Sequence, residues 1–483
     1  MSRLIVGPFN RVEGDLEVRL EVGDGTVREA RVVSTLYRGF ERILAGKVPA
    51  DALVYAPRIC GICSVSQSVA AAHAIGAAQG ISPPPNGSLA INVVHAAENV
   101  ADHLTHFYLF FMPDFARATY RDELWYEAVA ERFTAVKGTA AEDTLRARAA
   151  FLHIMGVLAG KWPHTLAIQP GGSTRSVTAN EVARLAGILA AFRRFLERRL
   201  YGDSLERIST LSSQQELLAW AGERRPESSD FRLFLHISGA LALDRLGRAS
   251  DRFMSYGAYG RNGGALFPAG VWSETGLRAL DIGAISEDVS CAWYASHATS
   301  EPPAVGTTIP DVSRRGAYSW CKAPRLGGEV VEVGAIARQV VAGHPLVRDL
   351  VERGGANVMS RVVARLVEIA LVVRAMERWV AALQPGEPFC VHAPTPDDAT
   401  GVGLTEAARG SLGHWLTIRR GRIETYQIVA PTTWNFSPRD AGGTPGALEQ
   451  ALVGAPLREG EKDPVSVQHI VRSFDPCLVC TVH

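Results

Sequence analysis

The chain has 483 residues, and 50 lysines and arginines balance 50 aspartates and glutamates. This balance gives no electrostatic footprint for nucleic acid or for an anionic membrane. Hydrophobic residues make up 47% of the chain and charged residues 21%, which is typical of a globular protein and excludes disordered, collagen-like and coiled-coil proteins. Seven cysteines are too sparse for a disulfide scaffold. They favour a reducing, cytoplasmic location in which some thiols bind metal.

Strands are predicted at the N-terminus, and mainly helices after residue 49. Alternating apolar residues predict a β-hairpin over 16–33. The Ala-rich stretch 64–80 predicts a helix that ends at Gly80. Apolar residues at helical spacing predict three more helices, over 88–112, 178–201 and 358–383.

The remaining segments predict one domain without a membrane span. Loops and short strands are expected over 222–345, and the Gly/Pro-bearing stretch 437–464 is the one that resembles a linker. The most apolar helical stretch, 364–383, carries five charged residues, which a membrane-spanning helix would rarely tolerate. The chain starts without an apolar targeting segment. We therefore expect a mainly α fold with small β regions (α+β), as a single domain over residues 1–483.

Two C-x-x-C pairs are the strongest chemical signal. Cys60 and Cys63 form the first pair, and Cys477 and Cys480 form the second, three residues before His483. Four thiolates suit a soft metal. A structural zinc site and a four-cysteine iron–sulfur cluster are the alternatives, although zinc pairs usually lie within a few tens of residues of each other.

From end to end, the chain resembles the large subunit of nickel–iron hydrogenases. R-x-C-G-x-C around the first pair and D-P-C-x-x-C-x-x-H around the second match the two signature elements of that family. Further matching segments are 11–14 (RVEG), 38–41 (RGFE), 170–172 (PGG), 318–320 (YSW), 322–325 (KAPR), 406–415 (EAARGSLGHW) and 431–435 (PTTWN). The resemblance implies that a long central helix bundle brings both cysteine pairs together at a buried metal site. The quinone-site subunit of respiratory complex I is a related alternative, but it lacks the four thiolates.

The resemblance also implies which metals the thiolates bind. Cys60 and Cys477 match terminal nickel ligands, while Cys63 and Cys480 match ligands that bridge nickel to an iron carrying carbon monoxide and two cyanides. Soft, deprotonated thiolates stabilise a redox-active nickel. The expected reaction is heterolytic cleavage of dihydrogen, with Cys477 as the first proton acceptor.

Other matching positions surround this centre. Arg409 and the Thr432 hydroxyl match donors to the cyanide nitrogens, and Asp114 and Asp475 match acidic residues that flank Arg409. Glu13 matches the first carboxylate of the proton relay, a role that a raised pKa would suit.

A second ion is expected near the C-terminus. Glu41, the backbone carbonyl of Ile428 and His483 match the ligands of Mg²⁺ in the family. Oxygen ligands suit such a hard cation, and the imidazole is less typical.

Several positions depart from most relatives. Asp15 stands where many relatives have a histidine, and Ala408 replaces the proline that commonly precedes the arginine. Gln67 replaces a histidine, so hydrogen bonding toward Cys63 must differ, and Ile62 and Phe110 are bulkier than the usual valine and leucine. We expect the two bulky side chains to narrow the gas passage and to favour oxygen tolerance. These features resemble the hydrogen-sensing (regulatory) subgroup, whose members signal to a histidine kinase at low turnover.

The role within the cell has two interpretations. A hydrogen sensor is the first, and a catalytic cytoplasmic (NAD-linked) or uptake hydrogenase is the alternative. In both, electrons must leave through an iron–sulfur small subunit, because the remaining Cys291, Cys321 and Cys390 are scattered. We expect a heterodimer with that partner.

Overall fold

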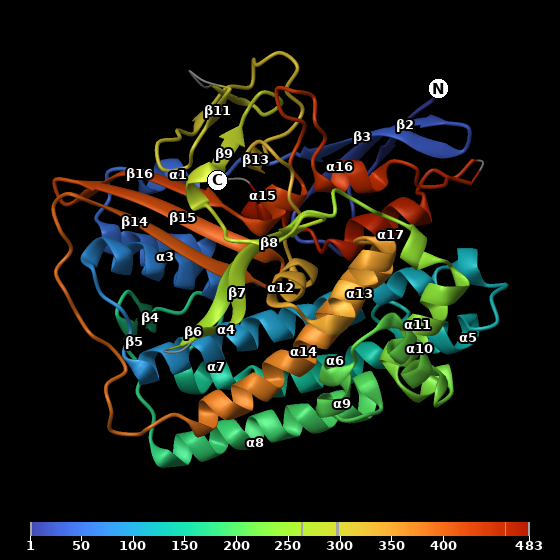
Figure 1. The fold of residues 1–483 in the computed structure, drawn as a ribbon, viewed down its shortest axis with the longest axis horizontal. Coiled ribbons are helices and arrows are strands. Elements are labelled where there is room, and N and C mark those ends of the chain that lie inside the picture. Colours follow the sequence, from blue (N-terminus) through green and yellow to red (C-terminus); the bar gives the residue numbers. More distant parts are fainter. Residues whose placement is uncertain (1, 262–263, 296–298, 459, 482–483) are drawn as a thin grey trace.

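The computed structural model describes residues 2–261, 264–295, 299–458 and 460–481. A helical bundle forms one half of the molecule, and small sheets with the remaining helices form the other (Figure 1). The bundle contains α4 (Pro85–Thr105), α5 (Tyr126–Phe133), α6 (Thr139–Phe151), α7 (His153–Leu158), α8 (Ala179–Phe195), α9 (Leu205–Thr210), α10 (Gln214–Gly222), α11 (Asp230–Ala240), α13 (Pro345–Gly354) and α14 (Val358–Ala381). The other helices are α1 (Phe40–Leu44), α2 (Ala52–Tyr55), α3 (Ser64–Gln79), α12 (Ala335–Ala342), α15 (Pro431–Asn435), α16 (Ala447–Leu452) and α17 (Val465–Ser473). The predicted α+β class is confirmed.

The sheets are small and antiparallel. The N-terminal sheet has the order β1-β2-β3, from β1 (Ser2–Val6), β2 (Leu16–Gly23) and β3 (Thr26–Ser34), and it contains the predicted hairpin. The C-terminal sheet is formed by β14 (Ala399–Ala407), β15 (Gly410–Arg419) and β16 (Arg422–Val429). The remaining strands are β4 (Ile168–Gln169), β5 (Gly172–Ser173), β6 (Phe253–Arg261), β7 (Gly264–Ser273), β8 (Gly276–Arg278), β9 (Ile285–Asp288), β10 (Tyr294–Ala295), β11 (Ser300–Glu301), β12 (Ile309–Pro310) and β13 (Ala323–Leu326).

Helix α14 crosses the centre of the bundle beside α4 and α8 (Figure 1). It begins at a capping box in which Asn357 and Ser360 exchange side-chain-to-backbone hydrogen bonds. Its charged residues pair inside the core, since Arg338 of α12 donates to Glu368 at 2.6 Å. Among the described residues, no helix is both long and apolar enough to cross a membrane.

Helix α3 packs closely against β14, and two glycines permit this contact. A Cβ atom on Gly403 would lie 1.9 Å from the Ala70 carbonyl oxygen, and one on Gly401 would lie 2.0 Å from that of Ala74. Only glycine therefore allows the helix to lie this near the strand. Because α3 follows Cys63 directly, this contact fixes the direction from which the first cysteine pair approaches the core.

Two predicted helices end differently from the sequence pattern. The α-helical part of 88–112 stops at Thr105 and continues as a π-helical turn, His106–Phe111, and a 3₁₀ turn, Met112–Ala116. Pro113 lacks the N–H group that an α-helix would need there. The predicted helix 178–201 likewise ends in a π-helical turn, Leu196–Tyr201.

The linker-like stretch 437–464 is part of the packed structure. It contains α16, whose Ala447 and Leu448 are fully buried. Its backbone pairs with the N-terminal hairpin, because the Gly454 N–H donates to the Val27 carbonyl at 2.8 Å. One hydrophobic cluster extends from Val6 to Cys480, so both ends of the chain contribute to the same core.

Candidate metal centre

The four cysteines of the two C-x-x-C pairs meet in the core. Their sulfur atoms all lie within 4.8 Å of one another, and all four residues are buried. The Sγ–Sγ distances are 3.5 Å for Cys60–Cys477, 3.3 Å for Cys63–Cys480 and 3.1 Å for Cys477–Cys480, and none of these cysteines forms a disulfide. The predicted convergence of the two ends of the chain is therefore confirmed.

The first pair is positioned by α3 and by an arginine from the preceding segment. Cys63 is the N-cap residue of α3, so its backbone is fixed by the start of that helix. Arg38 donates to the Ile59 carbonyl beside Cys60, and also to the Val479 carbonyl at 3.3 Å. Arg38 thus connects the two cysteine loops, a role that the sequence motif alone did not reveal.

The second pair is held against the N-terminal segment. The Glu13 N–H donates to the Pro476 carbonyl at 3.3 Å, and the Leu478 N–H donates to the Glu13 carbonyl at 2.7 Å, which forms a short parallel bridge. Gly14 has a φ of 81°, and a Cβ atom there would lie 3.0 Å from the Val479 nitrogen. The glycine therefore allows the two chain ends to run in direct contact.

Each of the four thiols affects the pKa of the others. Burial disfavours ionisation of Cys60, but hydrogen bonds from the other three thiols and the charge of Arg409 lower its pKa. Hydrogen bonds among the thiols, together with burial, raise the pKa of Cys63, and burial raises that of Cys477. Four thiols in so small a volume can all ionise only if a cation compensates their charge. The donor set therefore fits a soft metal centre.

Arg409 lies beside the thiols and is held by two carboxylates. It donates to Asp102 at 2.5 and 3.2 Å, to the Asp475 carboxylate at 3.1 Å and to the Asp475 carbonyl at 3.0 Å. Burial raises the pKa of the Asp102 carboxyl, and the charge of Arg409 opposes that rise. Arg409 keeps a raised pKa because both acids stabilise its charge. The predicted Asp475–Arg409 contact is confirmed.

The predicted contact between Asp114 and Arg409 is wrong. Asp114 accepts from Arg472 at 2.7 Å and from Arg11, and it lies 3.5 Å from His469. It follows the π-helical turn, so its side chain does not continue the helical face that carries Asp102. Asp114 instead connects the N-terminal segment to α17.

Asp102 is the residue that sequence reasoning missed, and a usable signal was present. Glu98 and Asp102 are acidic residues one turn apart on an otherwise apolar helical stretch, and both are buried. A buried acid in such a position requires a donor or a cation. Arg409 is that cation for Asp102.

Glu13 and Thr432 lie next to the second cysteine pair. Glu13 is half-buried, and burial together with the charge of Cys60 raises the pKa of its carboxyl, against Arg409 and Arg38. The Thr432 hydroxyl accepts from the Cys477 N–H at 3.1 Å. This bond uses an oxygen lone pair, so the hydroxyl hydrogen can still be donated elsewhere.

Gln67 interacts with a histidine of the C-terminal sheet. His414 lies with its Nε2 2.9 Å from the Gln67 Oε1, while the Gln67 N–H donates to the Cys63 carbonyl at 3.2 Å. The Gln67 Nε2 is buried and has no hydrogen-bond partner among the described residues. The hydrogen bond from Gln67 to Cys63 is therefore between backbone groups and does not involve the glutamine side chain.

Ile62 and Phe110 are both half-buried. Ile62 packs against the main core cluster beside the first cysteine pair. Phe110 lies in the π-helical turn, while Asp114, four residues later, is fully buried. A regular α-helix would place Phe110 and Asp114, four residues apart, on one face, but the π-helical turn His106–Phe111 changes that spacing.

Glu41 lies in a separate buried polar cluster. Its carboxylate accepts from the Ile428 N–H at 2.8 Å, and the Lys322 ammonium lies 3.5 Å away. Lys322 also lies 3.3 Å from Glu287 and donates to the Gln427 side-chain oxygen at 2.8 Å. Burial raises the pKa of Glu287 to about 7, while Lys322 lowers it. His483 lies outside the described residues.

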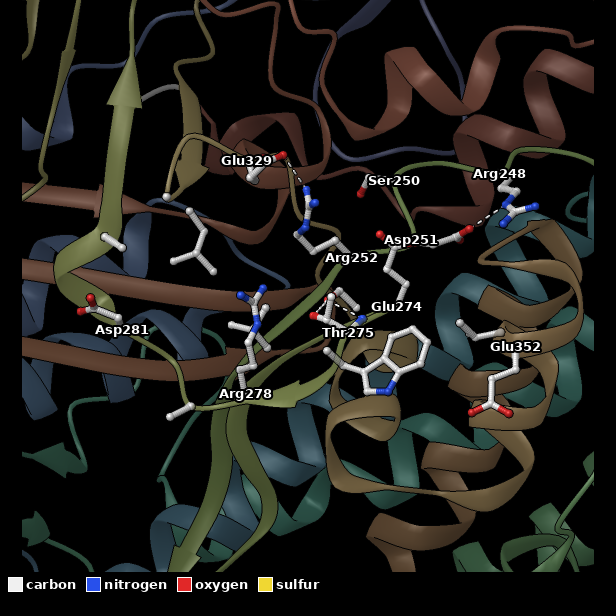
Figure 2. A pocket seen from close by; sticks show the side chains of 18 residues that line it. Arg248, Ser250, Asp251, Arg252, Glu274, Thr275, Arg278, Asp281, Glu329 and Glu352 are labelled. Carbon is white, nitrogen blue, oxygen red and sulfur yellow. Dashed lines mark hydrogen bonds and ion pairs between the residues drawn. The ribbon is translucent and has the colours of Figure 1, made fainter.

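A surface cleft is lined by other residues. It has a volume of about 940 Å³ and lies beside β7, β8 and α13. Figure 2 shows its mixed charges, with ion pairs between Arg248 and Asp251 and between Arg252 and Glu329. None of the four clustered cysteines lines it, so the cysteine site is a buried centre rather than an open cleft.

Comparison with known proteins agrees with this geometry. The family described as "Nickel-dependent hydrogenase" matches residues 38–124 and 234–483. The periplasmic [NiFeSe] hydrogenase large subunit of Desulfomicrobium baculatum is 30% identical, over 100% of this chain and 95% of that protein. The hydrogenase-2 large chain of Escherichia coli (strain K12) is 27% identical, over 100% and 97%.

Solved structures of hydrogenases are also similar to this chain. The reduced Ni-Fe-Se hydrogenase from D. vulgaris Hildenborough superposes with a TM-score of 0.86 at 30% identity, covering 100% of both chains. A reduced, active form of the Ni-Fe-Se hydrogenase from Desulfomicrobium baculatum gives 0.86 at 29% identity, again over 100% of both chains. With four buried thiols from both ends of the chain, an arginine beside them and a family match over most of its length, the chain belongs to the nickel-dependent hydrogenases, as a large subunit.

Proposed function

We propose that this large subunit holds a nickel–iron centre whose iron carries carbon monoxide and two cyanides, and that it activates dihydrogen there. The four converging thiols are the observation that carries the proposal. Cys60 and Cys477 would bind nickel alone, while Cys63 and Cys480 would bridge the two metals. When bound, the centre supplies the redox-active site at which dihydrogen is split into a proton and a hydride equivalent.

Two side chains would hold the cyanide ligands by hydrogen bonds. Four of the five N–H groups of Arg409 are engaged with Asp102 and Asp475, and the fifth, on Nη1, remains available. The Thr432 hydroxyl can donate as well, because its bond from Cys477 uses a lone pair. Both donors are fixed before any ligand binds, which reduces the cost of ordering them.

The proton would move from Cys477 to Glu13. The backbone bridge keeps these residues side by side, so the transfer needs no change of fold. The raised pKa of Glu13 brings its carboxyl closer to the working pH, where it can both accept and release a proton.

The Glu41 cluster would hold Mg²⁺ or another hard cation. Its acceptors are oxygens, and the carboxylates of Glu41 and Glu287 exceed the single charge of Lys322. We retain the Ile428 carbonyl and His483 as further proposed ligands. Removal of the cation should destabilise the fold, since it would leave two buried carboxylates with one ammonium.

Electrons would leave through an iron–sulfur small subunit. Among the described residues, the four clustered cysteines are the one group of side chains arranged for a metal of this kind, so a second cluster must lie on another chain. Arg38 is exposed, and so are the apolar residues Leu36, Ile43 and Val54 in the part of the chain that precedes the first cysteine pair. These exposed side chains near the first cysteine loop support a partner surface there.

Electron-transferring catalysis with such a partner, as in an uptake hydrogenase, is the role we favour. The named relatives are periplasmic and uptake-type hydrogenases or numbered hydrogenase large chains. A sensor role with a histidine kinase, low turnover and a cytoplasmic location is the second candidate, and Gln67 is the observation that favours it. A narrowed gas passage at Ile62 and Phe110, with oxygen tolerance, belongs to that second proposal.

The test is elemental and infrared analysis of the purified heterodimer. About one nickel per large subunit, with bands for iron-bound carbon monoxide and cyanide, is the expected result. Zinc alone would refute the proposal. A strain that lacks the chain then separates the roles: an uptake enzyme supports growth on hydrogen, whereas a sensor changes hydrogen-dependent transcription.

A further inference from the structure

The start of helix α3 has an unusual cap. The first amides of an α-helix have no acceptor within the helix, and the side chain of the N-cap residue usually accepts from the second and third of them. Here the N-cap residue is Cys63, which makes no side-chain cap hydrogen bond and whose sulfur points to the cysteine cluster. Another group must therefore accept from the Val65 and Ser66 amides.

Glu98 of α4 supplies that acceptor from a different helix. Its Oε2 accepts from the Val65 N–H at 2.8 Å, and its Oε1 accepts from the Ser66 N–H at 2.9 Å. The Ser64 hydroxyl donates to Oε2 at 3.2 Å, and Trp162 donates its Nε1–H to the same oxygen at 2.9 Å. The Glu98 carboxylate is 2% exposed.

The hydrogen-bond donors around Glu98 require its ionised carboxylate, because both oxygens must act as acceptors. Backbone and indole N–H groups can only donate, and they face Oε1 and Oε2 alike. The helix N-terminus also favours a negative charge. Burial raises the pKa of Glu98 to about 7, and these hydrogen bonds oppose that rise.

The same face of α4 also holds the arginine. Asp102 follows Glu98 by four residues, which is one helical turn, and it binds Arg409. Helix α4 therefore contacts two parts of the cysteine site. Through Glu98 it binds the start of α3, which follows Cys63, and through Asp102 it binds the guanidinium of Arg409. A displacement at Glu98 would change the position of Cys63 relative to Arg409.

We propose that Glu98 is a positioning residue for Cys63: it caps α3 in place of the cysteine side chain, so that the sulfur is free to bind the metals in a fixed direction. As far as the metals are concerned, this inference rests on the function proposed above. The cap itself stands on the contacts of this chain alone.

Glu98→Gln is the decisive change. An amide group replaces one oxygen by NH₂, and neither orientation suits the site, because N–H donors face both positions. We expect amide exchange of Val65 and Ser66 to rise about tenfold, with or without metal. In the nickel-loaded heterodimer we expect a shifted nickel electron paramagnetic resonance signal and shifted infrared bands.

Glu449→Gln is the matched control. Glu449 is also a fully buried acid that accepts an amide, from Val32 at 2.9 Å, and a hydroxyl, from Tyr318 at 2.8 Å, both on Oε1. Its Oε2 has no partner among the described residues, so a glutamine can keep both bonds. This variant should change neither the exchange of α3 nor the spectra.

Trp162→Phe removes one donor to Glu98 without altering α3, and it should give a smaller change in the same direction if Glu98→Gln does not fold. Unchanged exchange would overturn the proposal. Faster exchange with unchanged spectra would also overturn it, because Glu98 would then stabilise the helix only. A wild-type heterodimer without nickel would instead refute the proposed function, and the exchange measurements on the metal-free chain would still decide whether Glu98 caps α3.

Discussion

Asp102→Asn tests how Arg409 is held beside the thiols. The carboxylate accepts from both terminal nitrogens of Arg409, at 2.5 and 3.2 Å, and both residues are buried. Asparagine keeps the shape and one carbonyl acceptor, but it loses the charge and turns an NH₂ group toward the guanidinium. One charge-assisted hydrogen bond is worth roughly 1.5–3 kcal/mol. If Arg409 acts in the reaction, this loss corresponds to a rate reduction of about ten- to a hundredfold.

The assay is hydrogen-dependent reduction of a viologen dye, expressed per bound nickel. Normalising to nickel separates a slower reaction from a poorly assembled centre. The matched variant is Asp114→Asn, which alters an equally buried acid that binds Arg11 and Arg472 instead. It should lower thermal stability and leave the rate per nickel nearly unchanged.

Two results would refute this reasoning. Asp102→Asn with a rate per nickel within twofold of the wild type would mean that Arg409 does not depend on this pair. A rate loss in Asp114→Asn alone would support the sequence-based assignment over the geometry.

Three further predictions follow from the same structure. Cys477→Ser should abolish nickel-dependent activity, since an alkoxide is harder and far more basic than a thiolate, whereas Cys291→Ser, outside the cluster, should retain it. Glu13→Gln should suppress hydrogen–deuterium exchange with water while nickel content stays normal; wild-type exchange would remove Glu13 from the proton path. Gly403→Ala should lower the free energy of unfolding by about 1–3 kcal/mol, because its methyl group meets the Ala70 carbonyl. Thermal denaturation of that variant against Gly260→Ala, a strand glycine where a Cβ atom meets nothing within 4 Å and φ is not positive, checks this, and equal stabilities would contradict it.

The sequence predicted the cysteine cluster because its chemistry is local. Two short motifs contain all four cysteines, and only their meeting depends on the fold. The long helices were also predictable, since apolar spacing and caps such as Asn357 and Gly80 lie within a few residues of the elements that they define.

The partners of the charged residues were not predictable in the same way. Asp102 and Asp114 both lie in or next to one predicted helix. Which of them pairs with Arg409 depends on the π-helical turn that separates them. Glu98 acts on a helix that begins 34 residues earlier in the chain. Arg38 donates to the carbonyls of Arg58 and Val479, which lie 421 residues apart. Such pairings arise only when distant segments pack together.

The position of the two cysteine pairs near opposite ends of the chain has a thermodynamic consequence for metal binding. A metal centre bound to Cys60 and Cys477 joins residues 417 positions apart, which closes nearly the whole chain into one loop. In the chain-entropy description of cross-links, a loop of this length removes about 6 kcal/mol of conformational freedom from the unfolded state. Metal affinity and folding then become parts of one equilibrium, because all four ligands exist together only in the folded chain. The loaded protein should therefore unfold at a markedly higher denaturant concentration than the metal-free protein.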